Sequence, residues 1–319
     1  MAPDMPGEQH SNVVKYEEEF IQSSQGVKLF TCRWVPADRQ AKALICLCHG
    51  YGIECSIFMK DTGVRFAKAG YAVFGIDYEG HGKSAGTQCY IKSFDDLVAD
   101  CATFFRSVAE SVEYREKARF LYGESMGGAV ALLIHRKQPN YWSGAVLVAP
   151  MCKITEELIP PPLVLSILWT LTAIIPTWKL MPTQDITDVG IKDPDKRMEL
   201  RANPYLYRGR PRLKTAFELL MTSLDIEKRL DEVMLPFLIV HGEDDRVTDP
   251  SVSKLLYASA KSLDKTLKLY PNMWHGLTYG EPPEHIELVF SDIIAWLGKR
   301  SAAVCPEEPP LETSRNSLP

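Results

Sequence analysis

The chain has 319 residues, of which 45% are apolar and 24% are charged, and its formal net charge at pH 7 is −5. This length suits one large α/β domain with an insertion, or two average domains, and the composition is that of a globular protein. The acidic balance, together with the lack of a basic run of the kind that follows phosphates, argues against a nucleic-acid-binding surface.

The two ends of the chain are expected to be flexible tails, at residues 1–15 and 300–319. The first lacks the positive region followed by an apolar one that marks a signal peptide, and the second is rich in Pro and Glu and cannot bury enough apolar surface to order itself. Eight scattered cysteines form no CxxC pair and indicate buried, reduced thiols. We therefore expect a cytoplasmic protein without a metal site or a cofactor.

Strand-like and helix-like patterns alternate along the rest of the chain. Residues 17–23 and 27–35 flank a Ser-Gln-Gly turn and predict a hairpin. Further strands are predicted at residues 43–48, 71–76, 120–122, 144–148, 237–240 and 266–270. Helices are predicted over residues 62–69, 94–109, 126–136, 251–260 and 284–297. This alternation predicts an α/β fold, with a mostly parallel sheet covered by helices on both faces.

The alternation stops between residues 151 and 230, where helix patterns, prolines and loops dominate. We expect an inserted helical cap over this segment, on a core formed by residues 16–150 and 231–299. Residues 158–178 of the cap carry no charge. Four prolines interrupt them and leave an unbroken apolar helix only over residues 163–175, which is too short to span a bilayer comfortably.

The uncharged helix of the cap is expected to shape an acyl tunnel or to make peripheral contact with a membrane surface. Leu163 and Ile167, which lie in it, are candidate substrate contacts. The alternative interpretation is ordinary packing of the cap on the core, because apolar helices usually belong to a core. The position of this helix in the fold bears on the choice between these interpretations.

The strongest chemical signal is the segment Gly123-Glu124-Ser125-Met126-Gly127, which lies between the strand pattern of residues 118–122 and a helix pattern. A strand, a sharp turn and a helix form a nucleophile elbow, in which the serine adopts a strained backbone conformation. Glycines at positions 123 and 127 relieve the crowding around that serine. Ser125 is therefore the candidate nucleophile, and an ordinary serine in a Gly-rich turn is the alternative.

A serine nucleophile needs a base and an acid that orients it, in the chain order serine, acid, histidine. The strand at residues 237–240 ends in a turn with Asp244 and Asp245, and the strand at residues 266–270 ends in a loop with His275. Of the seven histidines, only His275 combines this order with a position at a strand end. Asp245 is favoured over Asp244 because its spacing from the preceding glycine leaves room for a turn toward His275.

An oxyanion hole needs two backbone N–H groups that point at the developing negative charge. The N–H of Met126, just after the nucleophile, is the first candidate. The second is the N–H of Tyr51, in the loop His49-Gly50-Tyr51-Gly52 after the strand at residues 43–48. The glycines of this loop permit a close approach of the backbone. A plain Gly-rich loop is the alternative interpretation.

These segments together resemble the monoacylglycerol lipase branch of the α/β-hydrolases, which is often described as serine aminopeptidase or hydrolase-4 type. The resemblance covers residues 16–299 and is greatest to the plant monoacylglycerol lipase-like group, which includes caffeoylshikimate esterases. The residues that carry it are His49-Gly50-Tyr51-Gly52, 77–84, 123–127, 241–247 and Trp274-His275-Gly276.

The resemblance implies hydrolysis of monoacylglycerols, lysophospholipids or phenolic acyl esters, so a hydrophobic acyl ester is the expected substrate. Mammalian members of the branch carry an acidic residue and an arginine in the loop after the oxyanion glycines, where they help to bind the glycerol end. Ile53 and Ile57 stand at the matching positions here, which weakens the case for a polar pocket of that kind. Ile53, Ile57 and Thr278 complete the candidate substrate contacts.

Two further functions would use the same residues. A small-molecule receptor on a hydrolase scaffold would keep the three side chains without turnover, because a fold does not fix a function. Acyl transfer to an alcohol would proceed through the same acyl-enzyme as hydrolysis. Halide and epoxide chemistry is not expected, because relatives with those activities carry Asp at the position of Ser125.

Overall fold

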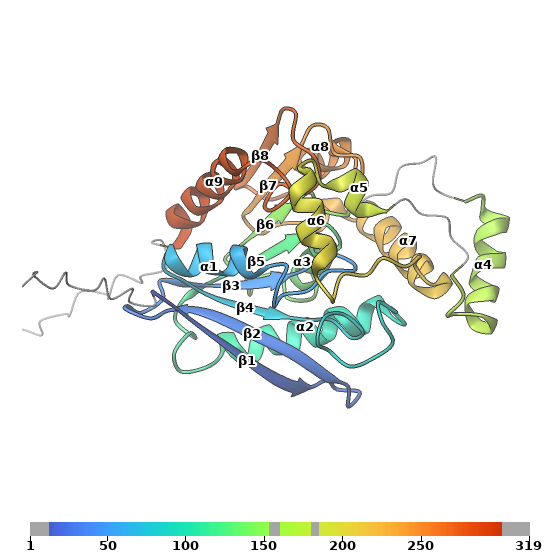
Figure 1. Ribbon diagram of the computed structural model, residues 1–319, viewed down its shortest axis with the longest axis horizontal. Helices are drawn as coiled ribbons and strands as arrows, with labels where there is room; N and C mark the ends of the chain where they lie inside the picture. The colour runs from blue at the N-terminus through green and yellow to red at the C-terminus, as the bar shows by residue number, and fades with distance from the viewer. Residues whose placement is uncertain (1–12, 153–159, 180–184, 302–319) are drawn as a thin grey trace, which may run out of the picture.

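The computed structural model describes residues 13–152, 160–179 and 185–301. These residues form an eight-stranded sheet with helices on both faces, which confirms the predicted fold class (Figure 1). The strands are β1 (Val14–Gln22), β2 (Lys28–Pro36), β3 (Ala43–Cys48), β4 (Tyr71–Ile76), β5 (Ala118–Glu124), β6 (Gly144–Val148), β7 (Phe237–Gly242) and β8 (Lys265–Tyr270).

The helices cover the predicted segments and fill the region between β6 and β7. They are α1 (Lys60–Lys68), α2 (Phe94–Ala109), α3 (Met126–Lys137), α4 (Pro162–Ile174), α5 (Ile186–Gly190), α6 (Pro194–Ala202), α7 (Leu213–Glu227), α8 (Pro250–Ser259), α9 (Pro283–Ser301) and a 3₁₀ turn, η2 (Leu230–Glu232). Val14 and Lys15 of the predicted N-terminal tail belong to β1, and Arg300 and Ser301 belong to α9. Val13 is a described residue that precedes β1, and residues 1–12 and 302–319 of the predicted tails lie outside the described residues.

The strands lie in the order β1-β2-β4-β3-β5-β6-β7-β8. β1 pairs with β2 and β2 pairs with β4 in antiparallel fashion, which confirms the predicted hairpin, and all other neighbours are parallel. Parallel strands end at the same edge of a sheet, so the loops that leave β3, β5, β7 and β8 emerge together. These loops carry Tyr51, Ser125, Asp245 and His275.

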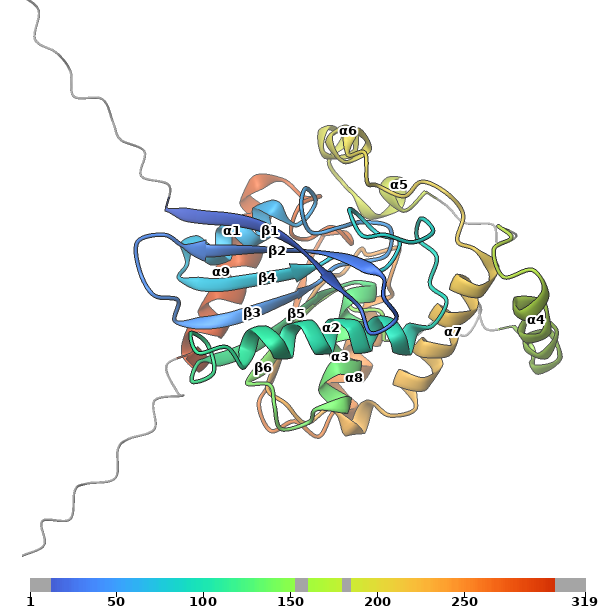
Figure 2. The same ribbon diagram turned by 90° about the horizontal axis from the view of Figure 1, so that it is seen from below.

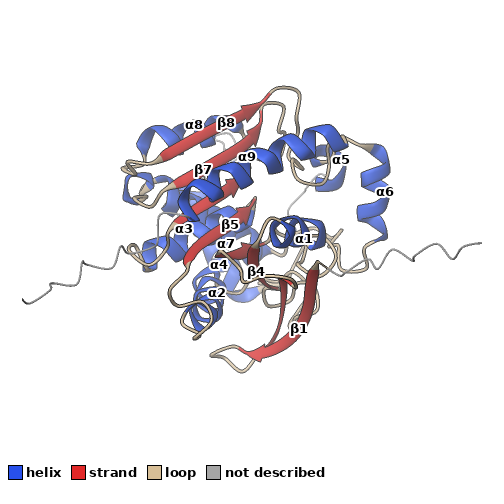
Figure 3. Ribbon diagram, turned by 90° about the vertical axis from the view of Figure 1, so that its left-hand side faces the viewer, coloured by secondary structure: helices blue, strands red, loops and turns tan. Residues whose placement is uncertain are grey.

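Alternating side chains of the central strands pack into two separate cores. Leu44, Cys46 and Cys48 of β3 point to a cluster that contains buried residues of α2, α3 and α8. The intervening residues of β3 point to a second cluster that contains residues of α1 and α9. Figure 2 shows these two groups of helices on opposite sides of the sheet, and in Figure 3 the red strands lie between the blue helices.

The seven described cysteines are buried and unpaired, as the sequence predicts. Cys46 and Cys48 share one face of β3 because successive side chains of a strand point to opposite faces. Cys305 lies outside the described residues.

The segment predicted as a cap contains α4, α5, α6 and α7, while residues 153–159 and 180–184 lie outside the described residues. α7 packs against α2 and α3 as well as against α4. α4 therefore lies on the outer side of α7, at one end of the molecule (Figures 1 and 2). In the described part of the chain, no helix combines the length and the apolar character that a membrane crossing requires.

Candidate active site

Ser125 occupies a sharp turn between β5 and α3. Its φ of 54° lies in the region that L-amino acids other than Asn and Asp seldom adopt. Three backbone hydrogen bonds hold it there: the Ser125 N–H donates to Val148 O at 3.0 Å, and the Ser125 carbonyl accepts from the N–H groups of Gly128 and Met151, each at 2.9 Å. The structure thus places Ser125 in the strained elbow that the sequence predicts.

Glycine is required on both sides of this elbow, as the sequence predicts from the crowding around Ser125. A Cβ atom on Gly127 would lie 1.9 Å from the carbonyl oxygen of Cys48, which is far inside van der Waals contact. A Cβ atom on Gly123 would lie 2.3 Å from the carbonyl oxygen of Gly127. The end of β3 and the start of α3 can therefore approach Ser125 only because these two side chains are absent.

The loop after β3 lies directly beside Ser125. A Cβ atom on Gly50 would come within 3.5 Å of the Ser125 Cβ, so this stretch of backbone borders the nucleophile. Among the described residues, neither the Tyr51 N–H nor the Met126 N–H has a hydrogen-bond acceptor. Each of these two N–H groups therefore lacks a competing acceptor among the described residues. The Tyr51 side chain anchors the loop, because its hydroxyl donates to Cys89 O at 3.0 Å.

His275 and Asp245 are in direct contact. The His275 Nδ1 lies 2.7 Å from Asp245 Oδ2, and both side chains are buried. The backbone N–H groups of Val247 and Thr248 donate to the other carboxylate oxygen, Oδ1, at 2.7 and 3.0 Å. Asp244, the other candidate acid, is exposed. Of the two adjacent carboxylates, Asp245 is thus the one that can orient the His275 ring.

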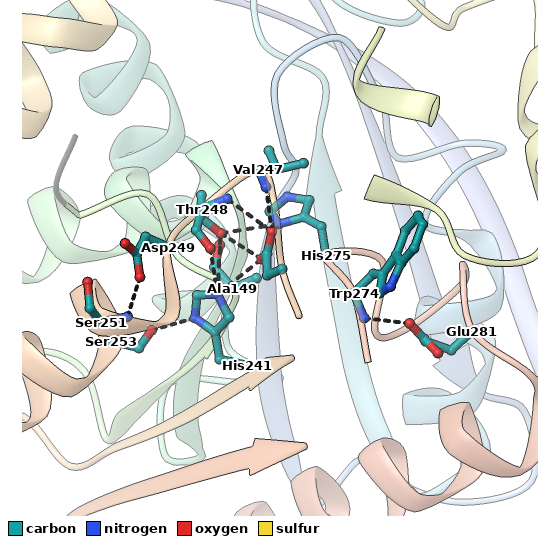
Figure 4. A network of polar contacts seen from close by, with 11 residues as sticks. Ala149, His241, Val247, Thr248, Asp249, Ser251, Ser253, Trp274, His275 and Glu281 are labelled. Atoms are coloured by element: carbon teal, nitrogen blue, oxygen red, sulfur yellow. Dashed lines mark hydrogen bonds and ion pairs between the residues drawn. The ribbon is translucent and has the colours of Figure 1, made fainter. Parts of the chain in front are cut away.

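Two further side chains reach the same carboxylate, and sequence reasoning gave neither of them a role. The Thr248 hydroxyl donates to Asp245 Oδ2 at 2.9 Å, and the His241 Nε2 lies 3.0 Å from that oxygen. Figure 4 shows His241, Thr248 and His275 together in one network of polar contacts. The sequence signal for Thr248 is its place just after Asp245, since an Asp side chain in a turn often accepts hydrogen bonds from the backbone of the residues that follow it.

The carboxylate of Asp245 is held in its ionised form. Burial alone would raise its pKa, but the charge of His275 and the hydrogen bonds from His241 and His275 outweigh burial and hold the pKa well below its usual range. A carboxylate that stays ionised can fix the Nδ1–H tautomer of His275 and stabilise the imidazolium ion. The opposite ring nitrogen, Nε2, is then left to accept a proton.

Thr278 contributes to the core beside the nucleophile. Its hydroxyl donates to Glu124 Oε1 at 2.9 Å, and Tyr122 donates to the same oxygen. All three side chains are buried. Burial raises the pKa of Glu124, while the hydrogen bonds from Tyr122 and Thr278 and the charge of His275 act in the opposite direction. Thr278 therefore ties the loop of His275 to the end of β5.

The other candidate substrate contacts lie at different distances from Ser125. The Ile53 side chain packs over Gly50, next to Ser125. Ile57 is 47% exposed and lines, with Thr278, a surface groove of about 410 Å³ between α1 and α6. Leu163 and Ile167 are 74% and 51% exposed on α4, on the outer side of α7. The structure thus places Ile53 over Gly50, which borders the nucleophile, and the two α4 residues on an outer surface.

The short helices of the cap segment meet the loop of His275. The Gly276 N–H donates to the carbonyl oxygen of Gly190, the last residue of α5, at 2.9 Å. A Cβ atom on Gly190 would lie 3.5 Å from the Cβ of His275.

In the described parts of the chain, no group of three His, Cys, Asp or Glu side chains has the arrangement of a metal site.

Comparison with known proteins assigns the chain to a family. The family model of Hydrolase_4, described as serine aminopeptidase, S33, matches residues 39–283. The chain belongs to this family. Proteins with similar sequences include a caffeoylshikimate esterase of Arabidopsis thaliana, which is 37% identical over 299 residues, 93% of this chain and 90% of that protein. A human monoglyceride lipase is 31% identical over 294 residues, 90% of this chain and 92% of that protein.

Solved structures confirm the α/β-hydrolase fold. A soluble variant of the monoglyceride lipase from Saccharomyces cerevisiae, in complex with a substrate analog, has a TM-score of 0.76 at 22% identity and covers 94% of this chain and 99% of that chain. A monoacylglycerol lipase from Paleococcus ferrophilus has a TM-score of 0.71 at 20% identity, with coverages of 90% and 99%. These structures confirm the predicted fold, while the family model and the two relatives above confirm the predicted family and make the chain a serine hydrolase.

Proposed function

We propose that this Hydrolase_4 member hydrolyses carboxylic esters of the monoacylglycerol or lysophospholipid type. In this proposal Ser125 is the nucleophile, His275 the base and Asp245 the acid that orients the base. The observation that carries it is the hydrogen bond of 2.7 Å between His275 and Asp245, at the sheet edge where the strained turn of Ser125 also lies.

The reaction would proceed in two halves. His275 Nε2 takes the hydroxyl proton of Ser125 while the serine oxygen attacks the ester carbonyl, and Asp245 stabilises the imidazolium ion that forms. The N–H groups of Tyr51 and Met126 bind the oxyanion, and each such donor lowers the barrier by about 3–4 kcal/mol. His275 then protonates the leaving alcohol. In the second half, His275 activates a water molecule that releases the acyl group from Ser125.

Names of relatives support two classes of substrate. Several relatives are monoglyceride lipases, among them the human and mouse proteins, which favours an acyl ester of glycerol. The plant relative at 37% identity is a caffeoylshikimate esterase, which makes a phenolic acyl ester the second candidate. The apolar side chain of Ile53 beside the nucleophile suits the hydrophobic part of either substrate.

A panel of substrates tests this proposal. Monoacylglycerol, lysophosphatidylcholine and caffeoyl shikimate would be supplied at equal concentrations, and kcat/KM would be measured for each. We expect the highest kcat/KM for monoacylglycerol, with more than one turnover per enzyme molecule. A single turnover with every ester would support a receptor instead. A new ester formed in the presence of added glycerol or shikimate would reveal acyl transfer.

We further propose that α4 makes peripheral contact with membranes, and that the protein is cytoplasmic. Large apolar side chains of α4 and the turn after it face solvent, including Ile174 at 70% and Trp178 at 56% exposure. A short helix that exposes such residues can lie in the interface of a bilayer without crossing it.

Replacing both Ile174 and Trp178 by Asp should weaken membrane binding about tenfold or more, because two large apolar side chains would no longer enter the interface. Sedimentation with phosphatidylcholine vesicles measures the bound fraction. Val112→Asp is the matched control, since Val112 is 84% exposed and lies in the loop after α2. Equal binding of the double variant and of the control would count against contact through α4.

A further inference from the structure

His241 and His275 share one carboxylate oxygen. His241 is the penultimate residue of β7 and is fully buried, and its Nε2 lies 3.0 Å from Asp245 Oδ2. The same oxygen lies 2.7 Å from His275 Nδ1. The proposed mechanism uses only the second of these contacts. The buried imidazole of His241, which also contacts the carboxylate of Asp245, therefore has no role in that mechanism.

The hydrogen-bond partners of His241 determine which of its two ring nitrogens carries a hydrogen. Its Nε2 lies 3.0 Å from both Asp245 Oδ2 and Thr248 O, and neither oxygen carries a hydrogen when Asp245 is ionised. This nitrogen must therefore carry a proton. The Nδ1 lies 2.7 Å from the hydroxyl of Ser253, a fully buried residue of α8 (Figure 4). No other acceptor for that hydroxyl exists among the described residues, so Ser253 donates to Nδ1, and the ring of His241 carries its hydrogen on Nε2.

We propose that His241 is a positioning residue that lowers the basicity of His275 by donating a hydrogen bond to the oxygen that the two imidazoles share. This inference rests on the proposed role of His275 as the base. An N–H donor on Asp245 Oδ2 withdraws part of the negative charge that stabilises the His275 imidazolium ion. His275 therefore stays unprotonated, and able to accept the proton of Ser125, down to a lower pH than with Asp245 alone.

Other titratable groups lie around His275 and the carboxylate of Asp245, and the test must leave them unchanged. Glu124 approaches from the end of β5, and burial raises its pKa. Tyr279 lies in the loop of His275 itself; burial and the charges of Glu124 and Asp245 raise its pKa. Substitutions at His241 leave Glu124 and Tyr279 in place. A difference between His241 variants therefore reports on the shared oxygen of Asp245.

His241→Leu and His241→Gln form a matched pair for the test. Leucine removes the donor, whereas the amide N–H of glutamine can reach the position of Nε2. The pH dependence of kcat/KM for p-nitrophenyl butyrate reports the pKa of His275 in the free enzyme. In His241→Leu we expect the acidic limb to move up by about 0.5–1 pH unit, which makes kcat/KM about three- to tenfold lower at pH values below that limb. His241→Gln should return the limb to its position in the unsubstituted enzyme.

A merely structural role for His241 predicts a different result. Loss of packing would lower kcat/KM by the same factor at every pH and leave the limb where it is in both variants. That outcome would overturn the inference while leaving the proposed function intact. The proposed function fails on different results, namely full activity of variants of Ser125 and His275 or a single turnover with every ester, so the two failures are distinguishable.

NMR spectra of the unsubstituted protein with ¹⁵N-labelled histidine give a second measurement that does not depend on whether the leucine variant folds. We expect the His241 signals to show the neutral Nε2–H tautomer at every pH at which the protein is folded, while the signals of His275 titrate. An Nδ1–H tautomer, or a His241 ring that gains a proton together with His275, would contradict the inference.

Discussion

Replacing Ser125 by Ala is expected to reduce kcat for ester hydrolysis by about a millionfold, to the level of the remaining oxyanion and binding contributions. The hydroxyl oxygen is the atom that forms the acyl-enzyme, and no other group in the elbow can take its place. Alanine keeps the Cβ atom and tolerates the same φ of 54° about as well as serine, so the backbone hydrogen bonds to Val148, Gly128 and Met151 should persist. Turnover of p-nitrophenyl butyrate measures the loss.

Two controls accompany this prediction. The thermal unfolding midpoint of Ser125→Ala should match that of the unsubstituted protein, which separates loss of the nucleophile from loss of the fold. Ser107→Ala removes a hydroxyl that, among the described residues, bonds Phe104 O within α2 alone, and should leave turnover unchanged. A labelled fluorophosphonate should react with the Ser107 variant and not with the Ser125 variant. Full activity of Ser125→Ala would remove Ser125 from the mechanism.

The sequence predicts the central strands and the elbow well because local patterns determine them. The strand at residues 43–48 is apolar throughout, as a strand buried on both faces must be, and the structure has the same bounds. The helix over residues 94–109 begins after Ser93, whose hydroxyl accepts from the Asp96 N–H at 3.2 Å. Gly123 and Gly127 are likewise required by contacts that any strand–turn–helix elbow makes.

Packing of the cap segment is not visible in local patterns. Thr215 and Glu218 of α7 accept hydrogen bonds from the N–H groups of Ile91 and Phe94, at 2.9 and 2.8 Å. These contacts attach α7 to the start of α2 across more than a hundred residues of sequence. The periodicity of the α7 sequence does not predict them. The role of His241 could not be predicted from local patterns for the same reason, because its hydrogen bonds depend on Ser253 and on the turn at Thr248.

Replacing Asp245 by Asn is expected to lower kcat about ten-thousandfold, because the change forces His275 into the wrong tautomer. The N–H groups of Val247 and Thr248 point at Oδ1, so the amide oxygen must occupy that position. The amide nitrogen then takes the position of Oδ2, where it meets the N–H groups of His241 and His275. Three donors cannot bond one another. His275 can bond the amide only with an unprotonated Nδ1, which puts its hydrogen on Nε2 and leaves it unable to accept the proton of Ser125.

The neighbouring carboxylate provides the matched control for this change. Asp244 precedes Asp245 directly and is exposed, so Asp244→Asn alters the same net charge without reaching His275. We expect kcat of Asp244→Asn to stay within about twofold of the unsubstituted enzyme, since an exposed charge in water contributes little. Combining Asp245→Asn with Ser125→Ala should cost no more than Ser125→Ala alone, because the orienting acid acts only through the nucleophile. Equal losses in the Asp244 and Asp245 variants would show that a general change of charge, and not the His275 tautomer, is responsible.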